Sequence, residues 1–100
     1  MRPLTQTAAA ATLYEQRLLG ILELEEAFEA WLQTPEGREN ERMAWASFQR
    51  VARAYDLLIA DVPERIEARI LYGKFLSRMG DAEGAFLQFS EAYRMDPNLA

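Results

Sequence analysis

Four glutamates in one stretch of the chain are the side chains closest to a metal-binding pattern. Glu25 and Glu29 are one helical turn apart, Glu26 lies three residues before Glu29, and Glu23 precedes them. Helical bundles bind hard metal ions with such carboxylates, but those sites usually add Glu-x-x-His motifs on neighbouring helices. Because the chain has no histidine, we expect these glutamates to form a solvated polar face. We expect no metal or other cofactor.

The commonest catalytic side chains are missing. The chain has neither cysteine nor histidine, which excludes thiolate nucleophiles, imidazole bases and zinc sites built on these residues. Paired carboxylates remain available for acid–base chemistry, but nothing in the sequence places two of them in a cleft. No glycine-rich phosphate loop or nucleophile elbow occurs. We therefore expect a protein that is not an enzyme.

A basic pair, Lys74 and Arg78, is spaced to lie on one face of a helix. Such a pair can hold the carboxylate of an acidic peptide. The alternative is a solvated helix face whose charges are balanced by Glu67 and Asp81, and this is the interpretation that we favour.

Composition limits the classes of partner. The 100 residues suffice for one domain with a modest core, and 16 acidic against 11 basic residues give a net charge of -5. Neither half of the chain is basic, so we expect no nucleic-acid binding. The most apolar stretch contains the four glutamates, so we expect no membrane insertion. The N-terminus lacks a signal-peptide pattern, and we expect a cytoplasmic protein.

Apolar spacing of three and four residues predicts an all-α fold. The four helices that we expect cover residues 7–33, 35–60, 64–79 and 82–95. Thr34 and Pro35 start the second helix, although Asn40 weakens its first turns, and Gly80 with Asp81 separates the last two helices. The short first connection predicts an antiparallel hairpin over residues 7–60. Gly20 is expected to mark a bend or a close helix contact, and Trp31 and Trp45 to pack together in the core.

The last third of the chain carries a 34-residue spacing, between Pro63 and Pro97. This is the length of a tetratricopeptide repeat. Counted from Ile66, the small, aromatic and proline positions of that repeat are occupied by Gly73, Ala85, Phe89, Ala92 and Pro97. Residues 66–99 therefore resemble one repeat of this family, with one departure, since Arg69 stands where tryptophan is common.

The resemblance implies a fold and a binding surface. Residues 64–97 would form a repeat-like helix pair that follows the hairpin in a single domain over residues 1–100, as a short right-handed α-solenoid. The family's concave groove would here be lined by Glu67, Ile70, Lys74, Ser77 and Arg78. The residues left facing a missing neighbour would be Phe86, Tyr93, Met95 and Leu99, while Phe89 would pack inside the helix pair.

The function that we expect is non-catalytic protein binding, as a scaffold, adaptor or small chaperone. A partner helix or peptide would bury these apolar faces. One alternative is a module that assembles into homodimers or larger oligomers. Another is an accessory or regulatory fragment of a larger repeat protein.

Overall fold

The computed structural model describes the backbone of residues 2–99 and the side chains of residues 13–99. In that range it contains five helices and no strand, which confirms the all-α class. The helices are α1 (Arg2–Leu32), α2 (Pro35–Glu39), α3 (Glu41–Asp61), α4 (Glu67–Arg78) and α5 (Ala82–Met95). No helix in the described range has an apolar stretch long enough to cross a membrane. The chain divides into two compact units, Met1–Ala54 and Tyr55–Ala100, and the solenoid arrangement stays a prediction.

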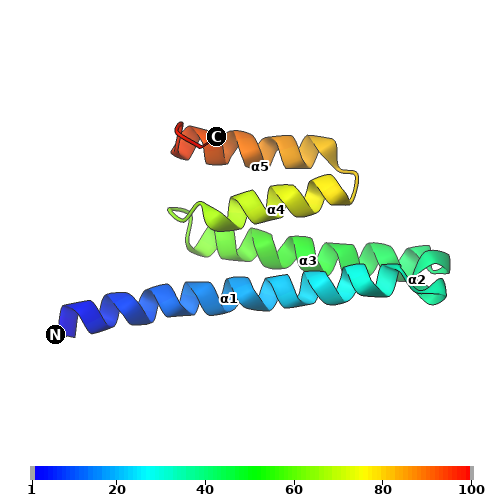
Figure 1. The fold of residues 1–100 in the computed structure, drawn as a ribbon, viewed down its shortest axis with the longest axis horizontal. Coiled ribbons are helices and arrows are strands. Elements are labelled where there is room, and N and C mark those ends of the chain that lie inside the picture. Colours follow the sequence, from blue (N-terminus) through cyan, green and yellow to red (C-terminus); the bar gives the residue numbers. More distant parts are fainter. Residues whose placement is uncertain (1, 100) are drawn as a thin grey trace. The chain divides into compact units, whose positions relative to one another are not determined.

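In the first unit, α1 and the first part of α3 lie antiparallel, joined through α2 (Figure 1). Tyr14, Ile21 and Phe28 are buried, and their seven-residue spacing places them on one stripe of α1. The antiparallel pairing of the predicted hairpin is therefore observed within this unit. α1 begins at Arg2, before the predicted start at Thr7.

Thr34 ends one helix and starts the next. Its hydroxyl donates to the carbonyl oxygen of Trp31 over 2.6 Å and accepts the N–H of Gly37 over 3.1 Å. Pro35 follows at the first helical position, where no N–H is needed. One side chain thus satisfies backbone groups of α1 and of α2, which keeps the connection short.

The predicted second helix is divided at Asn40. Its backbone leaves the helical region, with φ -109° and ψ 80°, and its side-chain oxygen accepts the N–H of Met43 over 3.0 Å. Asparagine favours this role because its side chain replaces a missing helical hydrogen bond. The long helix α3 therefore begins at Glu41, as the weak first turns suggested.

The second unit is built around stacked aromatic rings. The ring of Tyr55, near the end of α3, stacks on Tyr72 of α4 with 4.8 Å between ring centroids. It lies tilted against Phe75, with centroids 6.2 Å apart. Tyr55 and Phe75 are fully buried, so these two contacts hold the end of α3 against α4.

The predicted start of the third helix was wrong by three residues. Helix α4 begins at Glu67 rather than Glu64, because residues 62–65 form a turn in which the N–H of Arg65 bonds to the carbonyl of Val62 over 3.2 Å. Proline favours the second position of such a turn as well as a helix start. Pro63 is therefore compatible with a turn and with a helix start, and the sequence alone does not distinguish the two.

The connection between α4 and α5 confirms the prediction for Gly80 and Asp81. Gly80 has a φ of 88°, and the N–H of Asp81 reaches back to the carbonyl of Leu76 over 2.8 Å. This pairing and the positive φ form a Schellman ending, which glycine adopts without strain. The carboxylate of Asp81 then accepts the N–H of Gly84 over 2.9 Å and caps α5.

Replacing two glycines of the first unit by alanine should change the free energy of unfolding in opposite directions. A methyl group at Gly37 would overlap the backbone carbonyl of Trp31, whereas one at Gly20 would meet nothing within 4 Å. The expected close contact at Gly20 is therefore wrong. In urea unfolding, we expect Gly20→Ala to raise the free energy of unfolding by about 1 kcal/mol and Gly37→Ala to lower it by about 1–3 kcal/mol. Equal effects of the two substitutions would contradict this packing.

The Tyr72 hydroxyl should make the fold sensitive to alkaline pH. Burial, together with the hydrogen bond to Asp56 and the negative charges of Asp56 and Asp81, raises the pKa of Tyr72 to about 12 from 10.0. The unfolded chain loses this proton first, so the stabilisation is present below pH 10 and is lost as pH rises from 10 towards 12. Urea unfolding across this range should show a loss of up to about 2–3 kcal/mol. Tyr72→Phe should flatten the slope, whereas the exposed control Tyr93→Phe should not.

Candidate protein-binding surface

Helices α4 and α5 approach each other closely because the residues at their contact are small. Ala85 and Ala92 of α5 are buried, and the ring of Phe89 lies where a side chain of Gly73 would stand. A methyl group on Gly73 would come within 2.6 Å of that ring. Gly73 therefore provides the space for Phe89, and the two residues mark the contact line between the helices.

Three aromatic side chains form an exposed ridge along α5. Phe86, Phe89 and Tyr93, which we call the aromatic stripe, follow one another at intervals of three and four residues and so share one side of the helix. Phe86 is 67% and Tyr93 56% exposed, and Phe89 keeps 38% exposure although it packs on Gly73. Burying large apolar side chains is favourable by about 1.5–3 kcal/mol each, so this ridge is a ready contact surface.

One face of α4 contains the residues predicted to line a groove. These residues, which we call the α4 face, are Glu67, Ile70, Lys74, Ser77 and Arg78. All of them are exposed except Ile70, which is half-buried. The buried residues of α4, among them Tyr72, Phe75 and Leu76, lie on other sides of the helix.

The aromatic stripe and the α4 face lie on the same side of the α4–α5 hairpin. Ile70 and Ser77 lie three residues before and four after Gly73, and Phe86 and Tyr93 stand at the same offsets from Phe89. On a right-handed helix, the residue three before and the residue four after a given position both lie to the same side of that position. Because α4 and α5 run antiparallel (Figure 1), the same sense brings both pairs to one side of the hairpin. The α4 face and two residues of the predicted patch, Phe86 and Tyr93, thus lie on one side of the hairpin.

Lys74 supplies an unpaired positive charge on this surface. The carboxylate expected to balance it, Glu67, forms an ion pair with Arg65 over 3.2 Å instead. Asp81 uses its side chain to cap α5. Among the described side chains no ion pair of Lys74 is found. The charge of Lys74 is therefore available to a carboxylate of a partner.

The sequence-based patch on α5 was partly misplaced. Met95 is exposed as predicted, but it follows Tyr93 by two residues, which places it on another side of the helix. Leu99 lies beyond the end of α5 and is half-buried. Phe89 packs on Gly73 of α4 as expected, but it also keeps 38% exposure, which was not predicted. Leu87 is 61% exposed but follows Phe86 directly, so it points away from the stripe.

Two expectations for the first unit were also wrong. Trp45 is exposed and stacks on Phe48 with 5.4 Å between ring centroids, so it is not a core partner of Trp31. The glutamates of α1 do not form a uniformly solvated face, because Glu25 is buried. No group of three metal-binding side chains is found in the described part of the chain.

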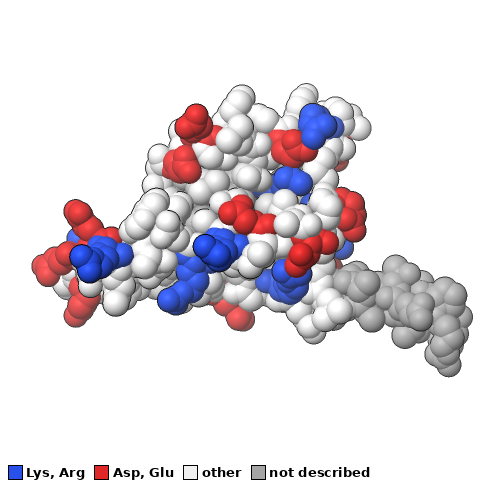
Figure 2. Space-filling view, turned by 180° about the vertical axis from the view of Figure 1, so that it is seen from behind, with Lys and Arg blue, Asp and Glu red and all other residues white. Residues whose placement is uncertain are grey.

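Charges of both signs alternate on the face of the protein shown in Figure 2. Basic side chains on this face are interspersed with acidic ones rather than forming a continuous area. Such a mixture is typical of a solvated surface.

Comparisons of the chain with protein-family models, with curated proteins and with solved structures found no match. The resemblance to a tetratricopeptide repeat therefore rests on the residues themselves. Gly73, Ala85 and Ala92 are buried in the α4–α5 hairpin, and Phe89 packs on Gly73. Together they make a compact helix pair with one exposed aromatic side.

Phe86, the most exposed residue of the aromatic stripe, should contribute little to folding. Phe86 is largely exposed and Phe75 is fully buried, so the two phenylalanines form a matched pair. We expect Phe86→Ser to change the free energy of unfolding by less than about 0.5 kcal/mol, and Phe75→Ala to lower it by about 3–5 kcal/mol. Urea denaturation followed by circular dichroism measures both. A large loss for Phe86→Ser would show that its ring supports the fold rather than a binding surface.

Proposed function

We propose that this protein is a non-catalytic protein-binding module, a scaffold, adaptor or small chaperone. It buries the apolar side of a partner helix or peptide against the aromatic stripe of α5 and the α4 face. The observation that carries the proposal is the stripe itself, because three aromatic residues at helical spacing stand exposed on one side of α5. The proposal includes the tetratricopeptide-like character of residues 66–99, a cytoplasmic location, and no nucleic-acid partner.

The chemistry of the surface favours a helix as the bound element. Side chains at three- and four-residue intervals present a ridge that packs into the grooves of another helix. The hairpin beneath is held by the small residues at Gly73 and Ala85, so little conformational entropy is lost on binding. Lys74 beside this ridge favours a partner segment that carries a carboxylate.

A second copy of the chain is the alternative partner. Two α5 helices can bury their stripes against each other in a four-helix bundle made of two hairpins. The same residues would then mediate self-assembly. The two alternatives therefore differ in the identity of the partner and not in the surface that binds it.

Site-specific photo-crosslinking separates these outcomes. A benzoylphenylalanine placed at Phe86 tests the stripe, and the same group at Leu87 is the matched control, with similar exposure on another side of α5. In cells of the source organism, the proposal expects adducts with a distinct protein from position 86 and not from position 87. Phe86→Ser should then weaken binding of that protein about 10- to 100-fold, given the worth of a buried phenylalanine.

Light scattering on a concentration series provides the second readout. A dimer that Phe86→Ser dissociates, with adducts only between copies of the chain, would establish self-assembly in place of a foreign partner. A monomer without adducts at position 86, or equal adducts at both positions, would contradict the proposed function.

A further inference from the structure

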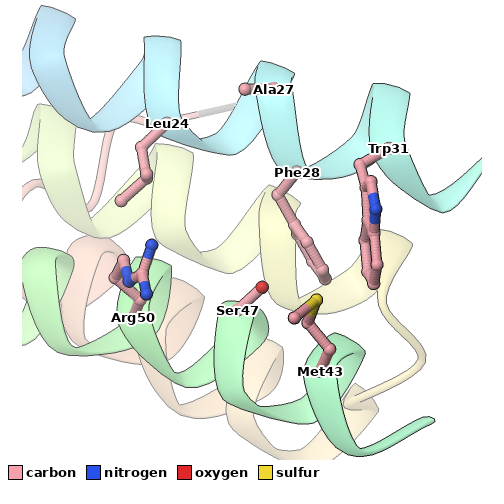
Figure 3. A pocket seen from close by; sticks show the side chains of 7 residues that line it. All are labelled: Leu24, Ala27, Phe28, Trp31, Met43, Ser47 and Arg50. Carbon is pink, nitrogen blue, oxygen red and sulfur yellow. The ribbon is translucent and has the colours of Figure 1, made fainter. Parts of the chain in front are cut away.

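A pocket lies between α1 and α3 in the first unit, and none of the residues proposed above for partner binding lines it. It has a volume of about 230 Å³. Its lining comes from two helices, with Leu24, Ala27, Phe28 and Trp31 from α1 and Met43, Ser47 and Arg50 from α3. Figure 3 shows side chains of the two helices pointing toward each other across this space.

The pocket exists because small residues interrupt the contact between two helices. Ala27 and Ser47 are the two smallest side chains of the lining, whereas Phe28, Trp31 and Met43 gather at one end and Leu24 faces Arg50 at the other (Figure 3). The three α3 residues follow at intervals of four and three, as do Leu24, Phe28 and Trp31. Both sets therefore run along one side of their helix, and this shared spacing is the sequence signal for the pocket.

The lining combines apolar walls with one positive charge. Leu24, Phe28 and Met43 offer no strong hydrogen bonds to water, and the Trp31 ring offers only its N–H. Water in this space is therefore poorly held and is displaced favourably by an apolar group. Arg50 is exposed and has no ion pair among the described side chains, although the chain carries more acidic than basic residues. The Ser47 hydroxyl adds a second polar group beside it.

We propose that this pocket binds a small amphipathic carboxylate, an apolar chain or ring that ends in one carboxylate group. The apolar part lies between Phe28, Trp31 and Met43, and the carboxylate pairs with the guanidinium of Arg50. The volume is below the roughly 300–1,000 Å³ of pockets for drug-sized ligands. The lining of α1 from Leu24 to Trp31 extends about 10 Å along the helix axis. A medium-length ligand, such as octanoate, matches both dimensions.

Trp31 makes the pocket measurable. The chain has two tryptophans, and replacing the exposed Trp45 by phenylalanine leaves Trp31 as the sole reporter. Titration of Trp45→Phe with octanoate should produce a saturable change in fluorescence. Octanol, which has the same chain length without the charge, should bind about tenfold more weakly, because a charge-assisted hydrogen bond is lost.

Two further substitutions, made in the Trp45→Phe background, decide the assignment. Arg50→Gln should remove the preference for octanoate over octanol, whereas Arg53→Gln, an exposed arginine on α3 outside the lining, should keep it. Ala27→Leu should fill the pocket and weaken both ligands. Circular dichroism checks that each variant is folded.

The proposal is overturned by any of three results. These are the absence of a saturable change up to millimolar octanoate, equal affinity for octanoate and octanol in Trp45→Phe, and a preference that survives Arg50→Gln. Because none of these measurements involves α5, they stand independently of the outcome for the protein-binding surface.

Discussion

The close approach of α4 to α5 is the constraint on which the candidate binding surface depends. Gly73 leaves room for the ring of Phe89, and the small residues Ala85 and Ala92 of α5 are buried. A larger residue at these positions would separate the helices, and the aromatic stripe and the α4 face would no longer adjoin. The same contact therefore supplies both the stability of the hairpin and the continuity of its exposed side. Phe89 serves in both, because its ring packs on Gly73 while the residue keeps 38% exposure.

Local signals predicted the ends of the helices well. Thr34, Gly80 and Asp81 act through hydrogen bonds to backbone groups at most five residues away, so their role is contained in the sequence around them. Pro63 was less informative, because proline suits a turn as well as the first position of a helix. The division at Asn40 was foreseen as weakness but not as a cap, since only the structure shows its side chain bonded to Met43.

The faces of the helices were harder to predict than their ends. Periodicity shows which residues share a side of a helix, but it does not show how much of that side a neighbour covers. The exposure of Trp45 and the burial of Glu25 depend on such coverage. The pocket of the first unit depends on the register between α1 and α3, which places Ala27 and Ser47 within one lining. In the second unit, Phe86 and Tyr93 were predicted as exposed and are so, whereas Phe89 packs on α4 as predicted but keeps 38% exposure.

The amino-acid composition has a chemical consequence for the α4 face. Lys74 is the only lysine among the 100 residues, and its ammonium group stands in solvent on that face. Apart from the α-amino group, Lys74 is therefore the only amine of this chain that amine-directed reagents can modify. A fluorophore or a surface tether attached through such a reagent would be placed beside the aromatic stripe. Immobilisation by amine coupling would for the same reason obstruct that side of the molecule, so attachment through a terminus would preserve its accessibility.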